Sequence, residues 1–364
     1  MSKNRLRTGW QRLNGPGRIA GVDLARGIAI VGMLAAHLLE TADAFVWSDP
    51  RTWTALVDGR SSILFATLAG VSIGLVTGGR VPLSGSSMSV ARGRIALRAA
   101  MLLVLGILLI LTGVPVYVIL PAYAILFLIA LPFTRMPART VVATAVVLAL
   151  VMPFLQPVLD GLPLWRMPFS PELDAFIGWH YPFTIWIAFV LAGLGVARAG
   201  ITRVSVQVRM LCAGGASAVV GYTLSALPAP VDGGYWASVW SADPHSSGLL
   251  EVVGSGGFAI AVLAACLLLC RLRPLKVITL PLRAGGAMPL TAYAAQLVIW
   301  AIVAGVVLGD TSDLVGFRAL EPFWPLTVGT LLGCTAWALL VGRGPLEWVL
   351  DRAARSVVSA EPRR

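Results

Sequence analysis

The chain alternates long apolar stretches with short polar ones along nearly its whole length. The apolar stretches run to about 20 residues, the length at which a helix crosses the hydrocarbon core of a membrane. Ten such spans are predicted: 19–40, 61–78, 93–112, 115–133, 138–158, 182–199, 207–227, 252–270, 287–308 and 323–342. The segment TGVP alone separates the third span from the fourth, which predicts a tight hairpin. The fold class is therefore all-α, a polytopic membrane bundle of about ten transmembrane helices.

Composition agrees with this pattern. Hydrophobic residues make up 57% of the 364 residues and charged residues 12%, whereas a soluble domain carries about 25% charged residues. The net charge of +11 is spread over short loops rather than collected in a basic domain. It indicates attraction to anionic membrane lipid and not to nucleic acid.

Basic residues also predict an orientation, because Lys and Arg gather in cytoplasmic loops. Most of the 28 Lys and Arg residues fall at the N-terminus, in every second loop and in the C-terminal tail. The alternate loops hold only Arg51, Arg60, Arg166 and Arg318, together with most of the Asp residues. Both termini are predicted to be cytoplasmic, in the inner (plasma) membrane of a bacterium.

The chain is predicted to form one transmembrane domain, 19–342, between a basic cytoplasmic tail, 1–18, and a second cytoplasmic tail, 343–364. The basic start is similar to that of a signal peptide, but the following apolar run is long enough to be a retained span. The four cysteines lie inside apolar runs, where small buried hydrophobes are favoured over a disulfide or a metal site. No metal is expected.

The first span, GVDLARGIAIVGMLAAHLLE, carries three ionisable residues. Asp23 and Arg26 lie one helical turn apart and can pair. His37 follows Arg26 by eleven residues, which brings it to within about 20° of the same helical direction and about 16 Å further along the axis. Each residue alone could pair or snorkel at the membrane surface. Together on one stripe, they favour a polar channel or an active site, because charged groups inside a membrane usually face a cavity.

Other candidate residues lie at the ends of later spans. Arg92, Arg94 and Arg98 stand at the predicted inner end of the third span, where they could hold phosphate or serve only as positive-inside charges. On the exterior side, we select five residues as candidates for contact with a substrate: Asp58, Arg60, His180, His245 and Glu251.

Several segments carry a family resemblance. GVDLARGIAIVGMLAAH, LFATLAGVSIGL, RIALRAAMLLVLG and ILPAYAILFLIALP resemble the first four spans of the transmembrane acyltransferase group. That group includes the heparan-α-glucosaminide N-acetyltransferases and the YeiB-like DUF418 bacterial proteins. GGAMPLTAYAAQLVIW and GPLEWVLDR, near the end of the chain, resemble the DUF418 C-terminal pattern.

This resemblance implies transfer of an acyl group, taken as acetyl, from cytoplasmic acyl-CoA to an acceptor beyond the membrane. The acceptor would be a carbohydrate or glycolipid of the cell envelope. The heparan enzymes carry Asn where His37 stands, and their proposed catalytic His falls in the loop after the first span. That loop has no His here. The spacing of Arg26 and His37 is instead similar to that of the separate acyltransferase-3 group, which implies a catalytic role for His37.

On this hypothesis His37 acts as a base or forms a transient acyl-imidazole, while Asp23 and Arg26 orient the site or contact the cofactor. Arg92, Arg94 and Arg98 would hold the CoA phosphates. A multi-pass transporter of a small solute is the alternative, and a non-catalytic membrane scaffold is a third interpretation. The sequence is compatible with a homo-oligomer.

Overall fold

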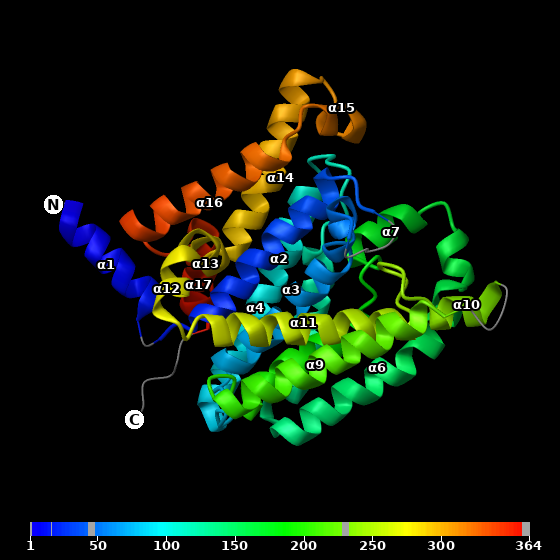
Figure 1. Cartoon of the computed structure of the whole chain (residues 1–364), viewed down its shortest axis with the longest axis horizontal. Coiled ribbons are helices and arrows are strands. Elements are labelled where there is room, and N and C mark those ends of the chain that lie inside the picture. Colours follow the sequence, from blue (N-terminus) through cyan, green and yellow to red (C-terminus); the bar gives the residue numbers. More distant parts are fainter. Residues whose placement is uncertain (1, 16, 43–47, 228–232, 359–364) are drawn as a thin grey trace. The chain divides into compact units, whose positions relative to one another are not determined.

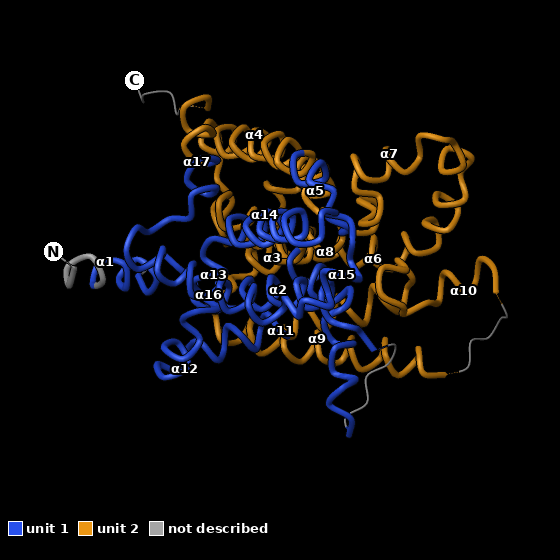
Figure 2. Tube along the Cα trace, turned by 90° about the horizontal axis from the view of Figure 1, so that it is seen from above, with its two compact units in different colours: residues 1–65, 108–116, 262–350 blue, residues 66–107, 117–261, 351–364 orange. Residues whose placement is uncertain are grey.

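The computed structural model describes residues 2–15, 17–42, 48–227 and 233–358. Figure 1 shows helices joined by turns along the described chain, which includes no strand. This confirms the predicted all-α class. The described helices fall into two compact units, residues 1–65, 108–116 and 262–350, and residues 66–107, 117–261 and 351–364, drawn in blue and orange in Figure 2.

Eight helical stretches of the described chain are long and apolar enough to cross a membrane. They are α2 (Ala20–Leu38), η1 with α3 (Pro50–Val76, α3 being Arg60–Val76), α4 (Gly85–Ile110), α6 (Ala138–Asp160), α9 (Val204–Ser225), α11 (Leu249–Leu269), α14 (Pro289–Val307) and α16 (Phe323–Leu340). Two shorter apolar helices match the remaining predicted spans: α5 (Leu120–Ala130), which continues into η2 (Leu131–Arg135), and α8 (Phe183–Ala199). The protein is a multi-pass membrane protein.

The remaining helices are short or lie at the chain ends. They are α1 (Ser2–Asn14), η3 (Pro163–Arg166), α7 (Ser170–Ile177), α10 (Gly234–Trp240), α12 (Arg273–Ile278), α13 (Leu280–Ala287), α15 (Leu314–Ala319) and α17 (Pro345–Val357). The sequence pattern did not predict these helices, because they are shorter than the apolar runs of about 20 residues that mark a membrane span.

Two details of the predicted spans are wrong. The hairpin after α4 is longer than TGVP, since α4 ends at Ile110 and α5 begins only at Leu120; Gly113 in this link has a φ of 74°. Pro121 and Pro289 fall inside the predicted spans 115–133 and 287–308, but in the structure they lie in the first turns of α5 and α14. Proline suits that position because the first turn needs no amide donor from it. Pro153 does lie inside α6.

The first unit is held by close backbone contact between α2 and α13. A Cβ atom on Gly27 would overlap the carbonyl oxygen of Leu282, and one on Gly286 would overlap that of Asp23. Small residues allow membrane helices to approach this closely. The contact places the α13 backbone directly beside Asp23.

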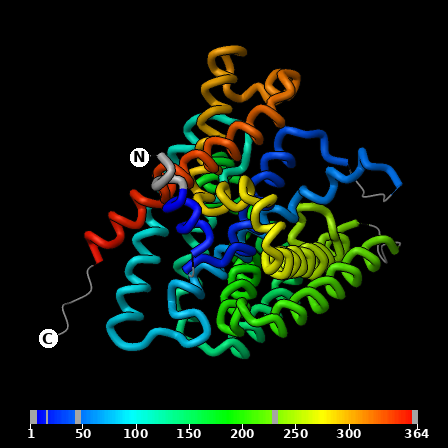
Figure 3. The backbone as a smooth tube through the Cα atoms, turned by 60° about the vertical axis from the view of Figure 1, so that its left-hand side comes forward, coloured from blue at the N-terminus to red at the C-terminus, as the bar shows by residue number. Residues whose placement is uncertain are grey.

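In the second unit, α3 and α8 pack in the same way. A Cβ atom on Gly70 would overlap the carbonyl oxygen of Val190, and one on Gly193 would overlap that of Thr67. The small residues of α3 and α8 therefore allow close packing of these two helices. The α9 helix and the first part of α11 also lie side by side (Figures 1 and 3), with Gly214 against Gly257 and Gly221 against Gly254.

Candidate active site

Asp23 is the centre of a buried charge cluster in the first unit. Its Oδ1 lies 3.3 Å from Nη1 of Arg26, and its Oδ2 lies 3.0 Å from Nη1 of Arg18. The Asp23 side chain is 7% exposed, while those of Arg26 and Arg18 are 19% and 33% exposed. The predicted pair of Asp23 and Arg26 is thus confirmed. Arg18, from the turn before α2, was not predicted as a partner.

A third arginine lies near this cluster. Arg283 of α13, the helix whose backbone lies beside Asp23, is fully buried. Its guanidinium donates to the carbonyls of Leu13 and Lys276, at 2.8 and 2.7 Å, and to Oδ1 of Asn14 at 2.9 Å. Two guanidinium groups therefore pair with one carboxylate, and a third lies buried on the neighbouring helix α13. The excess of positive charge makes this end of α2 suited to an anion.

His37 lies at the other end of the same unbroken helix. The continuous helix confirms the expected register between Arg26 and His37, eleven residues or about 16 Å apart along the axis. The His37 side chain is half-buried. Its backbone carbonyl accepts hydrogen bonds from Nη2 and Nε of Arg318, at 2.8 and 3.1 Å. Arg318 thereby satisfies one of the carbonyls that a helix end leaves without an intrahelical donor.

Asp58 and Arg60 lie at the beginning of α3, and both are half-buried. The Arg60 guanidinium donates to the carbonyl of Ala55. These residues belong to the same unit as His37.

In the second unit, the structure brings His180 and His245 together. Their ring centroids are 4.6 Å apart. The His180 ring stacks on Tyr117 at 3.8 Å, and Tyr181 and Trp186 lie 5.5 and 6.5 Å from the His245 ring. These residues come from separate segments of the sequence, so their contact could not be read from spacing.

Glu251 fixes the loop that carries His245. Its Oε1 accepts the amide of His245 at 2.7 Å, and its Oε2 accepts the amide of Ser247 at 2.7 Å. His245 and Ser247 have φ angles of 62° and 59°, a conformation that is unfavourable for side chains other than glycine. Glu251 is 3% exposed and stands in the first turn of α11, where a carboxylate is favoured. Glu251 thus joins the loop to α11 through the backbone amides of His245 and Ser247.

Comparison with protein-family models gives two matches. Residues 18–224 match the model described as heparan-alpha-glucosaminide N-acetyltransferase, catalytic, and residues 183–356 match DUF418, a protein family of unknown function. The first match covers more than half of the chain. The chain belongs to the heparan-alpha-glucosaminide N-acetyltransferase family. A search of curated proteins finds no match.

The acetyltransferase family model covers Asp23, Arg26, His37 and His180, whereas His245 and Glu251 lie in the part matched by DUF418 alone. The chain is therefore a member of a membrane acetyltransferase family, and its own C-terminal half matches DUF418. Among the described residues, no group of three or more His, Cys, Asp and Glu side chains could hold a metal ion.

Two of the three candidate phosphate-binding arginines of α4 donate hydrogen bonds to protein groups. Nε of Arg92 donates to Oγ1 of Thr134 at 2.9 Å, and Nε of Arg94 donates to the carbonyl of Val358 at 3.2 Å. Arg98, one turn after Arg94, is half-buried as they are. Their role in phosphate binding stays a prediction.

Two further polar groups were missed by the sequence analysis. Glu347 accepts from the amides of Leu290 and Thr291 at 2.8 and 3.2 Å, and from Oγ1 of Thr291 at 2.6 Å. It thus caps α14 and joins the two C-terminal motifs of the resemblance, TAYAAQ and GPLEWVLDR. Arg198, at the end of α8, is buried and donates to the carbonyls of Gly74 and Thr134.

The aromatic residues around His180 mostly pack on one another. Trp179 stacks on Trp165 at 5.0 Å and donates its indole N–H to Oδ1 of Asp160 at 2.8 Å. One face of the Trp179 ring is thus covered by protein, which fits a membrane-interface aromatic residue better than a surface on which a sugar stacks.

Proposed function

We propose that this protein transfers an acyl group, most simply acetyl, from cytoplasmic acyl-CoA to a sugar or other cell-envelope acceptor on the exterior side of the inner membrane. The observation that carries the proposal is the match of residues 18–224 to the N-acetyltransferase catalytic family. That region includes a helix with a positively charged cluster at one end and an imidazole at the other.

In the proposed reaction, the His37 imidazole takes the proton from the acceptor amine or hydroxyl. Imidazole suits this role because it exchanges a proton near neutral pH. The freed lone pair attacks the thioester carbonyl carbon, the carbon–sulfur bond breaks, and CoA leaves as a thiolate that is then protonated. In the alternative route, the His37 nitrogen itself attacks first and carries the acyl group as an acyl-imidazole.

Arg18 and Arg26 are proposed to attract the anionic cofactor, with Asp23 holding both guanidinium groups in place. Bidentate guanidinium donors suit phosphate oxygens. Arg92, Arg94 and Arg98 are proposed to serve the CoA phosphates at the same side of the membrane. Asp58, Arg60, His180, His245 and Glu251 are proposed to act on the acceptor side, where His180 and His245 offer ring surfaces and Glu251 fixes the loop.

Binding of CoA separates this proposal from a solute transporter. We expect CoA to raise the thermal midpoint of the purified protein by several degrees at a concentration of about 100 times its Kd, since a ligand that binds only the folded state stabilises it. Arg26→Gln weakens this shift, while Arg271→Gln, an exposed arginine outside the cluster, keeps it. Uptake of solute into vesicles without any effect of CoA would favour the transporter.

The role of His37 is tested by acetyl transfer from labelled acetyl-CoA to amino-sugar acceptors. We expect His37→Ala to lower the rate by about 10²–10⁴-fold, the usual contribution of a general base. A label on the protein that hydroxylamine removes, and that His37→Ala lacks, would indicate the acyl-imidazole route. Transfer by His37→Ala at the wild-type rate would overturn the assignment.

A further inference from the structure

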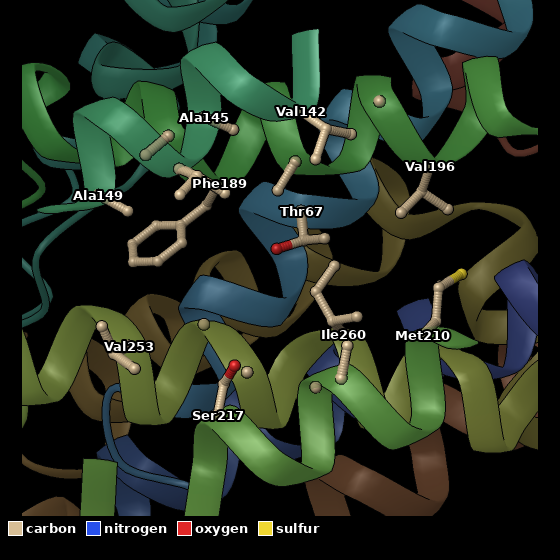
Figure 4. Close-up of a pocket in the computed structure, with 18 of the residues that line it drawn as sticks. Thr67, Val142, Ala145, Ala149, Phe189, Val196, Met210, Ser217, Val253 and Ile260 are labelled. Carbon is tan, nitrogen blue, oxygen red and sulfur yellow. The ribbon is translucent and has the colours of Figure 1, made fainter. Parts of the chain in front are cut away.

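The second unit contains an apolar cavity of about 530 Å³ that the proposed reaction does not use. Figure 4 shows side chains of α6 and α8 facing those of α9 and α11 across it, with Phe189 and Val253 towards one end and Val196 and Met210 towards the other. The volume falls in the range of small-molecule sites, about 300–1,000 Å³.

Small residues on the facing helices leave this space open. Ala188, Ala192, Gly195 and Ala199 of α8 all line it, so the cavity follows the helix over eleven residues, or about 16 Å of rise. On the opposite wall, α9 and α11 are in backbone contact through Gly214 and Gly257, which also line the cavity. The result is an elongated space that runs along helices of membrane-spanning composition.

Charge is confined to one end of this space. Arg209 is the one charged residue among the described residues that line the cavity, and its side chain is exposed. It stands in the second turn of α9, beside Val206 and near the end of α8 at Ala199. The positive-inside pattern predicts that this end faces the cytoplasm, where anionic lipid headgroups lie.

We propose that the cavity binds one hydrocarbon chain of an anionic phospholipid, with its phosphate headgroup at Arg209. This inference goes beyond the acyl transfer proposed above. The lining offers few polar groups, Ser217 and Thr67 besides Arg209, and a buried water needs two to four polar partners. A hydrocarbon chain fills apolar space without such partners and gains the dispersion contacts that an empty cavity loses.

The narrow, elongated form of the cavity favours a lipid chain over a protein helix. The small lining residues of α8 leave a space one side chain deep along the helix, whereas a membrane-spanning helix is about 10 Å across. A single chain bound lengthwise places its headgroup at the depth of Arg209, where the two opposite charges meet. The occupant also contacts Phe189, whose ring lies 5.6 Å from that of Trp186, the residue stacked towards His245.

The test is photo-crosslinking of the full chain in vesicles of phosphatidylcholine that contain a small fraction of lipid with a diazirine in one chain, followed by peptide mapping. Two probes are compared, phosphatidylglycerol and phosphatidylcholine with the same labelled chain. We expect adducts on cavity-lining residues such as Met210 and Ile260. Phosphatidylglycerol should be favoured about fivefold, the effect expected of one arginine near a lipid surface.

Two pairs of variants sharpen this test. Ala149→Phe fills the cavity from α6 and should lower the cavity adducts several-fold, while Ala143→Phe on the exposed face of the same helix should keep them. Arg209→Gln should remove the preference for phosphatidylglycerol, while Arg203→Gln, which does not line the cavity, should keep it. A thermal midpoint and monodisperse elution for each variant establish that it is folded.

Adducts restricted to outward-facing residues such as Val147 and Val219, with no change in Ala149→Phe, would overturn the proposal. An equal yield of cavity adducts with phosphatidylglycerol and phosphatidylcholine in the wild type would overturn the proposed headgroup contact at Arg209. Cavity residues found cross-linked to a second copy of the chain, in place of lipid, would assign the space to an oligomer contact instead.

Discussion

Asp23 is the residue whose replacement should disturb the first unit most. Its carboxylate is buried and paired with both Arg18 and Arg26. Removal of one partner from a buried ion pair leaves uncompensated charge and costs about 3–5 kcal/mol. We therefore expect Asp23→Ala to lower the thermal midpoint of the purified protein strongly. Asp351→Ala, which breaks the more exposed pair with Arg355, should leave it nearly unchanged, and equal effects would contradict the account.

Glu251 is expected to act on activity through the loop it binds. Glu251→Gln keeps the size of the side chain but removes the charge that strengthens two amide hydrogen bonds, each worth about 1.5–3 kcal/mol. We predict a faster hydrogen exchange of the His245 and Ser247 amides and a raised KM for the acceptor. Glu172→Gln, on the exposed face of α7, is the control. Unchanged exchange in Glu251→Gln would show that the loop is held by other contacts.

Residue contacts differ in how far the sequence predicts them. The pair Asp23–Arg26 follows from helical spacing alone. Arg283 lies 260 positions from Asp23, and His245 lies 65 positions from His180, so only the tertiary packing of their helices brings them together. Arg198 and Glu347 were missed for a related reason. Each binds backbone groups of a distant segment, and every residue type offers such groups, so the sequence does not indicate which of them come close.

At the scale of elements, the contact of α2 with α13 gives a sharp comparison of neighbouring glycines. A Cβ on Gly286 would overlap the backbone oxygen of Asp23, whereas one on Gly285 would meet only the side chain of Leu331 at 3.3 Å. Overpacking typically costs about 1–3 kcal/mol. Gly286→Ala should lower the thermal midpoint clearly and Gly285→Ala little. A reversed order would contradict the α2–α13 packing.

The short helix α7 should respond to pH through Asp174. Burial raises the pKa of this carboxyl above its ordinary value of 3.8, opposed by a hydrogen bond from the backbone of His180. The folded state therefore binds the proton more tightly than the unfolded state. The stability of α7 should rise as the pH falls through the folded-state pKa of Asp174 towards 3.8. It should be lost as the pH rises through that folded-state pKa. Hydrogen exchange of α7 amides between pH 4 and 7 measures this, and Asp174→Asn should abolish the dependence.

The sequence predicted which long helices exist better than it predicted the residues at which they begin and end. All ten apolar runs coincide with helices, because a long apolar period has few alternative structures. The beginnings of α5 and α14 were misplaced because a proline can either break a helix or start one. The short helices α7, α10, α12, α13 and α15 depend on tertiary packing and carry no long-period signal.

At the scale of the whole molecule, the alternation of basic loops predicts that both termini face the cytoplasm. A fluorescent protein fused after the C-terminal residue should fold and fluoresce, while a periplasmic reporter enzyme at the same site should be inactive. Insertion of the same reporters after Ser312, in a loop predicted to be exterior, should give the opposite result. Identical behaviour at both sites would require an orientation or a number of spans other than the one predicted. The division into one transmembrane domain and two tails stays a prediction.

The most direct test of the central claim uses protein reconstituted in liposomes with labelled acetyl-CoA on the side of the termini. Amino sugars and a cell-envelope glycolipid extract are supplied on the other side. The account predicts label on an acceptor beyond the membrane, and its loss with His37→Ala while CoA still stabilises that variant. Label that never leaves acetyl-CoA with any acceptor, or equal transfer by wild type and His37→Ala, would contradict it.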